Sequence, residues 1–493
     1  MNSLSLPPSY CKRLILKANV KKILTLTVHD LASDGHGIAR SGRDVYFIPG
    51  ALPGETVIAE MLERKRKIWY CRLVSIEQVS EHRVEPFCPH YKRCGGCDLQ
   101  HLAYDQQVVL KQQRVARELS RQGIEIEHWD APLIAKDQQW HYRRRARLGI
   151  RYNKSDKEVF IGFRESQSKH LTNIDICPVL VEHAALDWQA WRGRLAQLEG
   201  ISRFTHIEVL QASERLVLVF RVLKKLTDND RKRLQSWAVE LDIDIYIRPD
   251  DEQPLEVINE VISPLTHNVL GHDLTIHPDY FVQVNKTINQ LMVAEAKAWL
   301  APEAGSRVWD LYAGHGNFSV PLAQDAIVDA VEVSDEMVQA IEQHAQQLCT
   351  DSDVRGNKGD RGLIAHKADL SNSDSLSSLP NPDYVLLDPP RAGASACIDE
   401  LIKRKAKRMV YVSCDPATLA RDLKALSDDF DVERITILDM FPHTHHIETM
   451  VLLVPARKSG QGRTKMMNDK LKTQAKTQSK AKEKGASRGK SKR

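Results

Sequence analysis

The sequence predicts a multidomain protein with a small β-barrel, a central α+β domain and a C-terminal α/β domain built on an open sheet. Three observations predict it. A chain of 493 residues is too long for a single hydrophobic core. Apolar and polar residues alternate between glycine turns in the N-terminal part of the chain. In the C-terminal part, apolar runs end abruptly in polar residues. The expected divisions are an N-terminal extension at 1–21, the barrel at 22–80, the central domain at 81–277, the α/β domain at 278–456 and a tail at 457–493.

Charge is distributed unevenly along the chain. The tail that begins at Arg457 holds 14 Lys and Arg against Asp469 and Glu483, a net charge of +12, so the rest carries −7 of the total +5. This tail is rich in Lys, Gln and Ser and has too little apolar surface to fold. It either attracts phosphate groups or is a solvated extension.

The cellular compartment follows from apolar runs and cysteine use. No apolar run approaches the roughly 18 residues of a membrane span, and Lys12 and Arg13 interrupt any signal-peptide core. We therefore expect a cytoplasmic protein with no membrane partner. Nine cysteines in a reducing compartment are not expected to form a disulfide framework, so clustered cysteines indicate metal binding.

The barrel is predicted from Lys22 to Val79, where short alternating runs are separated by Gly and Pro turns. Its basic run 64–67 precedes Trp69 and Tyr70, which places cations beside rings that can stack on bases. A solvated hairpin surface is the alternative. The segments DGHGIAR (34–40) and PGALPGE (49–55) resemble a TRAM domain, an oligonucleotide-binding-like barrel, and this resemblance implies RNA as the partner.

A cysteine cluster follows the barrel. Cys88, Cys94 and Cys97 have the spacing C-x5-C-x2-C, and Cys177 follows later beside a proline, as Cys88 does. Four thiolates can hold zinc or a 4Fe-4S cluster. Structural zinc usually has paired cysteine hooks, whereas a three-plus-one arrangement with glycines 95 and 96 for close backbone approach favours the 4Fe-4S cluster.

An arginine-rich stretch lies between the third and fourth cysteines. If it is a strand, Arg143, Arg145 and Arg147 share one face, where they can grip phosphates. Trp140 and Tyr142 interleave with them, which favours this interpretation over a solvated strand edge. The rest of the central domain, 180–277, alternates strand-like and helix-like runs and is interpreted as scaffold.

Three strand-like runs of the α/β domain end in residues suited to chemistry. Asp388 follows the run 384–387, Cys414 follows 409–412, and Glu448 lies soon after the run 435–438. Because ligands bind at the carboxyl ends of strands in open α/β sheets, we expect the three side chains at one rim. A lone cysteine is more often a small buried hydrophobe, but the acidic residues expected beside Cys414 favour a nucleophile.

The same domain begins with a cofactor-type turn. The run RVWDLYAGHGNF (307–318) gives a strand, a glycine turn and a helix start, where a ligand can approach the backbone. The next strand ends at Glu332, placed to bond a ribose diol, and Asp369 follows the third strand, within reach of an adenine amino group. The alternative for Glu332 is a helix-capping acid.

Four motifs carry a family resemblance. The segments DLYAGHGNF, DPPRAGA, YVSCDPATLARD and HTHHIE resemble the RNA uracil-C5 methyltransferases, and the likeness covers about residues 22–456. This resemblance implies a Rossmann-like class I methyltransferase domain that uses S-adenosylmethionine. The barrel and the cysteine cluster narrow the expected substrate to a uridine of 23S ribosomal RNA, and we expect a monomer.

The resemblance also implies roles for individual residues. Cys414 attacks C6 of uracil, Glu448 removes the C5 proton, Asp388 bonds the uracil edge or the cofactor, and Phe281 can stack on a flipped base. Five further positions match the cofactor-binding residues of the family: Gln283, Tyr312, Asn317, Glu332 and Asp369.

Two expectations concern the surroundings of Cys414. A sulfonium charge and helix termini are expected to depress its pKa. Asp415 stands where the family has Asn, and its carboxylate is expected to point away from the thiol. Two other functions stay open from the sequence: a transfer RNA uracil-C5 methyltransferase, and an inactive RNA-binding iron-sulfur assembly factor.

Overall fold

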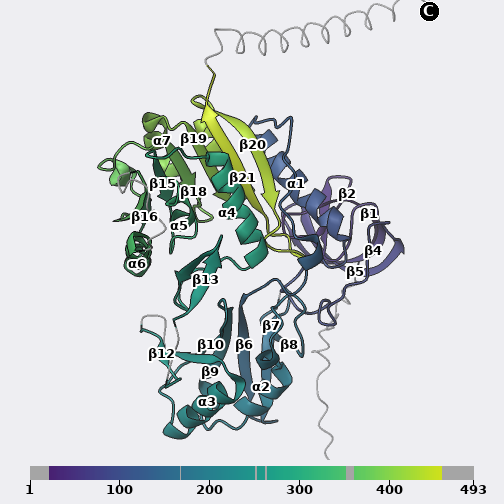
Figure 1. Ribbon diagram of the computed structural model, residues 1–493. Helices are drawn as coiled ribbons and strands as arrows, with labels where there is room; N and C mark the ends of the chain where they lie inside the picture. Colours follow the sequence, from purple (N-terminus) through teal and green to yellow (C-terminus); the bar gives the residue numbers. More distant parts are fainter. Residues whose placement is uncertain (1–21, 167, 250–252, 261–263, 351–359, 458–493) are drawn as a thin grey trace, which may run out of the picture.

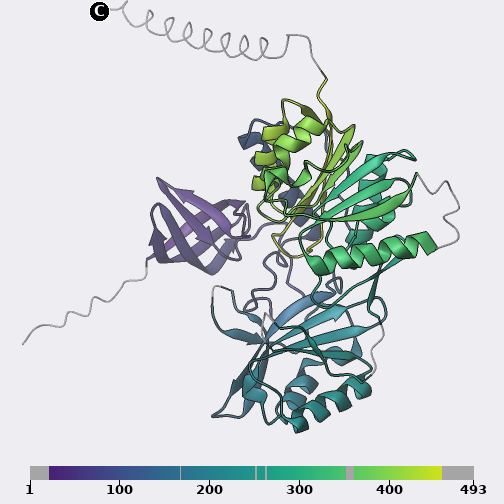
Figure 2. The same cartoon turned by 90° about the vertical axis from the view of Figure 1, so that its left-hand side faces the viewer.

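The computed structural model describes residues 22–166, 168–249, 253–260, 264–350 and 360–457. The predicted N-terminal extension and all but the first residue of the predicted tail lie outside these ranges. The α/β domain lies against one end of the central domain, and the small barrel stands to one side of both (Figures 1 and 2). Within the described ranges, no helix combines the length and the apolar character needed to cross a membrane.

The N-terminal barrel closes as the sequence predicts. Its five strands pair in the order β1-β2-β3-β5-β4. Their bounds are β1 Ile23–Leu31, β2 Gly37–Ser41, β3 Asp44–Ile48, β4 Thr56–Lys65 and β5 Ile68–Gln78. Alternate side chains such as Val28, Ile48 and Val57 fill its core, which explains the period-2 pattern. In the basic hairpin, Arg64 lies over the Trp69 ring at 5.3 Å and pairs with Asp44 at 2.9 Å.

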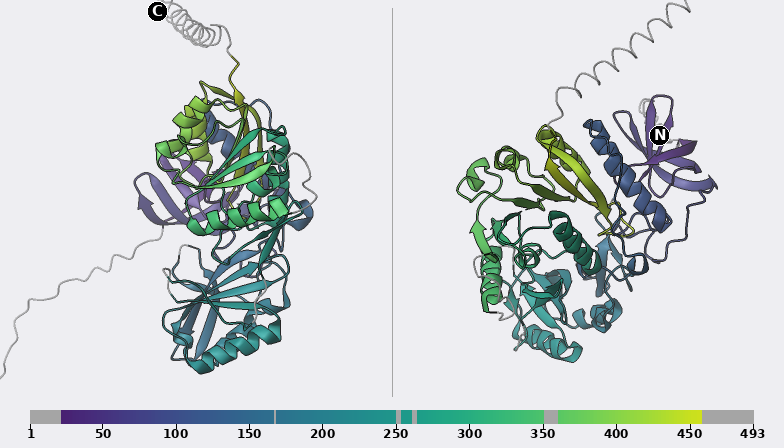
Figure 3. Two further views of the ribbon diagram at one scale, coloured as in Figure 1. Left: turned by 60° about the vertical axis from the view of Figure 1, so that its left-hand side comes forward. Right: turned by 45° about the horizontal axis from the view of Figure 1, so that its top comes forward.

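Helix α1, Tyr104–Arg121, packs on the α/β domain, although it falls within the stretch 81–277 that the sequence assigns to the central domain. Its buried stripe contains Val108, Val115 and Leu119 at helical spacing, and these side chains join the core beneath helix α8, Pro416–Leu426. α1 therefore lies between the barrel and the last two strands of the α/β domain (Figure 3).

The central domain is a seven-stranded sheet in the order β12-β11-β10-β9-β6-β7-β8. Its strands are β6 Arg145–Asn153, β7 Glu158–Arg164, β8 Leu171–Asn173, β9 Phe204–Gln211, β10 Leu216–Val222, β11 Asp244–Arg248 and β12 Glu256–Val257. Helices α2 Trp188–Leu195 and α3 Asp228–Leu241 cover it, and Trp188 and Trp191 of α2 are buried in the core that α2 forms with the sheet. The hairpin of β13 Thr266–Val269 and β14 His272–Thr275 leads to the α/β domain.

The α/β domain contains the second seven-stranded sheet, in the order β17-β16-β15-β18-β19-β21-β20. Its strands are β15 Arg307–Leu311, β16 Ile327–Glu332, β17 Gly362–Lys367, β18 Tyr384–Leu387, β19 Arg408–Ser413, β20 Phe430–Leu438 and β21 Glu448–Pro455. The first five strands are parallel, and β21 runs antiparallel to both neighbours. The strand order reverses between β15 and β18, which is where such sheets bind ligands.

Helices cover both faces of this sheet. One core joins α4 Lys286–Leu300, α5 Ser319–Leu322 and α6 Asp335–Thr350 to the sheet. The other core joins α1, α7 Ile398–Arg404 and α8 Pro416–Leu426. With both faces covered, β18 and the inner residues of β19 are apolar, and this is why they appear in the sequence as apolar runs.

A candidate active site at the strand ends

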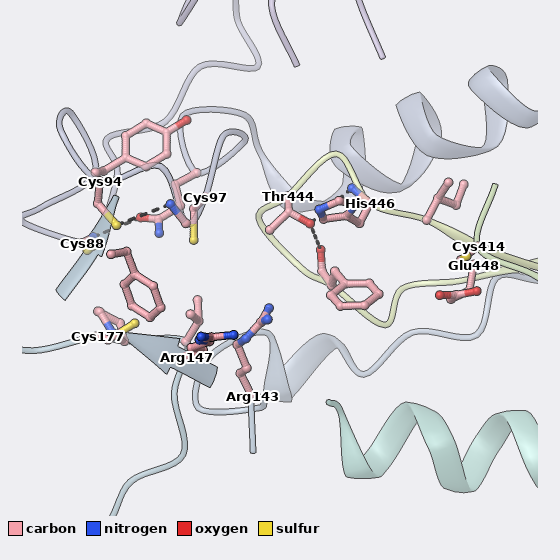
Figure 4. A pocket seen from close by; sticks show the side chains of 18 of the residues that line it. Cys88, Cys94, Cys97, Arg143, Arg147, Cys177, Cys414, Thr444, His446 and Glu448 are labelled. Atoms are coloured by element: carbon pink, nitrogen blue, oxygen red, sulfur yellow. Dashed lines mark hydrogen bonds between the residues drawn. The ribbon is translucent and has the colours of Figure 1, made fainter. Parts of the chain in front are cut away.

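A cavity of about 520 Å³ lies where the α/β domain, the central domain and the cysteine segment meet (Figure 4). The α/β domain contributes Cys414, Glu448 and Arg391 to its lining, and Phe281 stands at its wall with 63% of its surface exposed. Ring surface, three cationic side chains (Arg143, Arg147 and Arg391) and the Cys414 thiol thus line one cavity. A flat aromatic base fits such a lining.

Strand register brings Cys414 and Glu448 together. Ser413 ends β19 and pairs with Thr449 of the antiparallel strand β21, so the next residue, Cys414, lies across from Glu448. The two side chains lie side by side at one end of the cavity (Figure 4). Asp388 follows the neighbouring strand β18 at the same rim. The structure thus brings together the three residues expected at the strand ends.

Asp415 caps helix α8. Its Oδ1 accepts hydrogen bonds from the backbone amides of Ala417 (2.9 Å) and Thr418 (3.1 Å), and Pro416 occupies the first turn. Carboxylates are favoured at helix N-termini, where amide groups lack internal partners. The carboxylate is thus engaged at the start of its own helix, which agrees with the expectation that it points away from the thiol.

The pKa of Cys414 is raised in the protein alone. Burial raises the pKa of its thiol to about 11, and the nearby Glu448 and Asp388 raise it further, while Arg391 opposes them. The depressed pKa expected beside a bound sulfonium stays a prediction. Burial and then Asp388 also raise the pKa of Glu448 well above its usual value, again opposed by Arg391. Burial raises the pKa of Asp388 to about 7. A cation bound here would favour all three anions.

A second cavity of about 370 Å³ lies at the carboxyl ends of β15, β16 and β17. Tyr312, Glu332 and Asp369 line it, as the cofactor prediction requires. Tyr312 has a φ of +64°, a left-handed conformation that costs free energy for a residue with a side chain. The chain turns there from β15 into the glycine turn, where Gly314 and Gly316 also have positive φ.

Glu332 is engaged with the backbone on both sides. Its Oε2 accepts a hydrogen bond from the amide of Gly314 at 2.9 Å, and its Oε1 accepts from the amides of Val333 (2.8 Å) and Ser334 (3.0 Å). It therefore ties the glycine turn to the end of β16 and also bonds the amides just before α6. A ribose diol would meet a carboxylate that is already fixed in orientation.

The remaining predicted cofactor residues lie outside the lining of this second cavity. Asn317 exchanges two hydrogen bonds with Asn289 of α4, at 2.8 and 3.0 Å, and is nearly buried. The backbone oxygen of Gln283 accepts from Nε of Arg144 at 2.7 Å. Asp388 lies at the rim beside Cys414 and Glu448. The cofactor-binding role of all six predicted residues, including the three that line the second cavity, stays a prediction.

The four predicted metal ligands, Cys88, Cys94, Cys97 and Cys177, all line the first cavity (Figure 4). Burial raises the pKa of all four thiols. A Cβ at Gly95 would lie 3.0 Å from the backbone oxygen of Arg164, so the chain packs closely there, and the approach of this glycine to a cluster stays a prediction. Among the residues that the structure describes, no three His, Cys, Asp or Glu side chains stand close enough to hold a single metal ion.

The cysteines are remote from Cys414 in sequence. In the structure, the four thiols and Cys414 nevertheless line one cavity. A group bound at the cysteines would therefore face the same volume as the nucleophile. Only tertiary contacts between segments hundreds of residues apart create this arrangement.

The three arginines predicted to share one face, Arg143, Arg145 and Arg147, have different contacts in the structure. Arg143 and Arg147 line the cavity, and Arg147 lies 3.7 Å from Glu208. Arg145 instead donates hydrogen bonds to the backbone oxygens of Tyr280 and Pro278 (the latter at 2.9 Å). Phosphate contact by Arg143 and Arg147 stays a prediction, whereas Arg145 anchors the segment that carries Phe281.

Sequence reasoning missed several residues of the site. Arg391 lies in the DPPRAGA motif, and its guanidinium is the group that opposes the raised pKa values of Cys414 and Glu448. Asp310, fully buried at β15, accepts a hydrogen bond from Ser319 Oγ at 2.5 Å, and burial raises its pKa to about 7. Both residues lie in motifs that the sequence shows, Arg391 in DPPRAGA and Asp310 at the start of DLYAGHGNF, and these motifs could have pointed to them.

Comparisons with known protein families agree with this site. The family model described as tRNA (Uracil-5-)-methyltransferase matches residues 103–355 and 373–456, and the TRAM domain model matches residues 17–68. The chain is 39% identical over 441 residues to the 23S rRNA (uracil(1939)-C(5))-methyltransferase RlmD of Shewanella sediminis, a match that covers 87% of this chain and 95% of the relative. It is 35% identical to the RlmD of Aliivibrio fischeri, over 88% of this chain and 97% of the relative.

A solved structure has the same fold. The tRNA (uracil-54, C5)-methyltransferase of Pyrococcus abyssi, in complex with S-adenosyl-L-homocysteine, superposes with a TM-score of 0.67 and 24% sequence identity. The superposition covers 87% of this chain and 99% of that one. The α/β domain therefore has the class I methyltransferase fold that its strand order indicates.

Proposed function

The chain belongs to the family of RNA uracil-C5 methyltransferases, and from this premise we propose that it methylates C5 of a uridine in 23S ribosomal RNA. The observation that carries the proposal is the pairing of Cys414 and Glu448 across adjacent strand ends in a cavity that Phe281 also lines. The substrate class is supported by the RlmD relatives, whose printed names give 23S rRNA.

The reaction begins with the thiolate of Cys414. It attacks C6 of the uracil ring, which forms the C6–S bond and moves the C5–C6 π electrons onto C5. C5 becomes nucleophilic and takes the methyl group. S-adenosylmethionine supplies that methyl group as an electrophile. Because the pKa of Cys414 is about 11 in the free protein, Arg391 has to favour the thiolate against Glu448 and Asp388.

The reaction ends with removal of the C5 proton. The carboxylate of Glu448 takes the proton, the electrons of the C5–H bond re-form the C5–C6 double bond, and the C6–S bond breaks to release Cys414. A raised pKa makes Glu448 a stronger base than an exposed carboxylate. Asp388, at the same rim, is placed to bond the uracil edge or the cofactor. Phe281 would stack on the base after it leaves the RNA stack.

The cofactor would be held at the second cavity. Tyr312 offers a ring, Glu332 a carboxylate for the ribose and Asp369 a carboxylate for the adenine amino group. Gln283, Asn317 and Asp388 would complete the set if binding draws them toward this cavity. The glycine turn allows close approach to the backbone, as ligands at such turns require.

We further propose that Cys88, Cys94, Cys97 and Cys177 hold a 4Fe-4S cluster. All four thiols line one cavity, and a four-iron cluster takes one ligand at each of four separate corners. The three-plus-one order of the cysteines along the chain favours this cluster over the paired cysteines of structural zinc sites. Uracil methylation needs no redox step, so the cluster would cross-link the segments that form the RNA-binding cavity.

Methyl incorporation tests the proposed function. Wild type, Cys414→Ala and Cys71→Ala would be given unmodified 23S RNA and, separately, transfer RNA, and the methylated base would be mapped by mass spectrometry. Cys71 is a matched control because it is buried in the barrel core, away from both cavities. A single 5-methyluridine in 23S RNA that only Cys414→Ala abolishes is the expected result.

Other outcomes would reassign the protein. Methylation of transfer RNA alone would keep the chemistry and replace the substrate. No methylation of either RNA, and no covalent adduct with 5-fluorouridine RNA, would favour an inactive RNA-binding iron-sulfur factor. The adduct forms only if Cys414 attacks C6. It then accumulates, because the fluorine at C5 cannot be removed as a proton is.

A further inference from the structure

The loop that connects β20 to β21 runs from Asp439 to Ile447 and delivers Glu448 to the cavity. At its centre, His443 has a φ of +65°. A side chain in this left-handed region is strained, and the conformation persists only when its surroundings impose it. The contacts around His443 therefore decide where this loop lies.

Gln107 of helix α1 makes the principal contacts with His443. Its Oε1 accepts a hydrogen bond from the His443 backbone amide at 2.9 Å, and its Nε2 lies 3.3 Å from the ring nitrogen Nδ1. The same Nε2 donates to the backbone oxygens of Leu99 (3.0 Å) and Leu102 (2.8 Å). Only 1% of the surface of Gln107 is exposed, so water cannot replace these bonds.

The cysteine segment holds the other side of the same residue. The backbone oxygen of His443 accepts hydrogen bonds from the amides of Asp98 (3.1 Å) and Leu99 (3.0 Å). These two residues directly follow Cys97. Gln107 thus bonds His443 and also Leu99, whose amide bonds His443. It is therefore the central member of the network.

Two aromatic residues complete the support. The Tyr142 hydroxyl donates to the backbone oxygen of Pro442 at 3.1 Å, and the Trp140 ring stacks on the His443 ring with centroids 3.8 Å apart. The opposite side of the loop faces the cavity, where Thr444 and His446 line it beside Glu448 (Figure 4). Hydrogen bonds and ring stacking therefore fix the loop on its outer side, and its inner side lines the cavity.

We propose that Gln107 is a positioning residue for Glu448 and acts through the His443 turn. The inference rests on the proposed function, in which the Glu448 carboxylate takes the C5 proton while the C6–S bond breaks. The hydrogen bonds of Gln107 go to His443, Leu99 and Leu102, and none goes to the turn between β19 and helix α8 that carries Cys414. Loss of Gln107 should therefore slow release of the RNA from Cys414 and leave the attack by Cys414 almost unchanged.

Single-turnover kinetics with unmodified 23S RNA test the inference, because they separate formation of the covalent protein–RNA adduct from its breakdown. The variant is Gln107→Met, which keeps the volume and removes every hydrogen bond. Gln113→Met is the matched control, since Gln113 is exposed on the same helix. In Gln107→Met we expect adduct breakdown to slow by roughly tenfold to a hundredfold, as small misplacements of catalytic groups do. Adduct formation should stay within about twofold of wild type, the range of the control.

Tyr142→Phe provides a second variant that keeps the ring packing and so preserves the fold. It removes one hydrogen bond to the same loop, the bond to Pro442, so the adduct should accumulate, but less than in Gln107→Met. If adduct formation and breakdown fall together in both variants, or if neither changes, the positioning role is overturned.

Glu448→Gln is the reference. If Glu448→Gln itself accumulates no adduct, its proposed role as the base fails and the inference falls with it. If Glu448→Gln accumulates adduct and the two positioning variants do not, only the inference fails.

Discussion

The ammonium group of Lys111 lies 2.6 Å from the carboxylate of Asp439, and both side chains are buried, with 2% and 0% of their surfaces exposed. Lys111 also donates to the backbone oxygen of Phe441 at 3.0 Å. The pair joins helix α1 to the end of β20, across 328 positions of sequence. It therefore attaches the element that lies against the barrel to the loop that carries the candidate base.

The first prediction concerns this ion pair. Lys111→Met leaves the Asp439 carboxylate buried without its cation, and the free energy of unfolding should fall by about 3–5 kcal/mol. Lys111→Met combined with Asp439→Leu should recover much of the loss, because no charge stays buried. Denaturant unfolding curves measure both. Equal losses in the single and double variants would mean that the charge itself is unimportant.

The second prediction concerns Arg391 and pH. Because Arg391 opposes the raised pKa values of Cys414 and Glu448, Arg391→Gln should raise both of them further. Both groups act as anions, so activity rises with pH, and the profile of kcat should move to more alkaline pH in the variant. Arg147→Gln, from the same cavity, should weaken RNA binding without moving the profile. A profile that is identical in wild type and Arg391→Gln would exclude this electrostatic role.

The third prediction concerns the stability of the free protein. Burial raises the pKa of Asp388 to about 7 from an unfolded value of about 3.9, so the folded protein holds this proton more tightly. The stabilising contribution of the protonated form is complete below pH 4 and is lost as pH rises through 7. Asp388→Asn removes this loss and should stabilise the protein at pH 8 by roughly 1–3 kcal/mol, since the side chain is partly exposed and solvent screens it.

Melting temperatures at pH 8 and at pH 5 check the third prediction. The advantage of Asp388→Asn should shrink strongly at pH 5, where the wild-type carboxyl is mostly protonated. Methyl transfer should fall in the same variant, because stability and activity are opposed at such sites. An advantage of the same size at both pH values would contradict the assigned pKa.

The fourth prediction concerns the cysteine site. Cys177→Ser should reduce bound iron and the visible absorbance of an iron-sulfur cluster, whereas Cys71→Ser, in the barrel core, should leave both unchanged. Elemental analysis of protein purified without oxygen gives the answer. Stoichiometric zinc in wild type would replace the cluster proposal by a zinc site, and a wild type with neither metal would remove it.

Local patterns predicted much of the fold and part of the site. The runs before Asp388 and Cys414 are apolar because their strands are buried on both faces, and each ends where the chain leaves the sheet. Parallel strands share one carboxyl edge, so a local signal was enough to place both residues at one rim. Tyr312, Glu332 and Asp369 line one cavity for the same reason.

The sequence by itself determined the strands, the glycine turn and the chemistry-bearing residues at strand ends, because these depend on neighbours within a few positions. Tertiary structure alone decided that α1 packs on the α/β domain, that the four cysteines share a cavity with Cys414, and that Gln107 bonds His443. It also decided the raised pKa of Cys414, since burial and the charges of Glu448 and Asp388 act through space. Such interactions depend on which distant segments meet, and this information is absent from any short stretch of the chain.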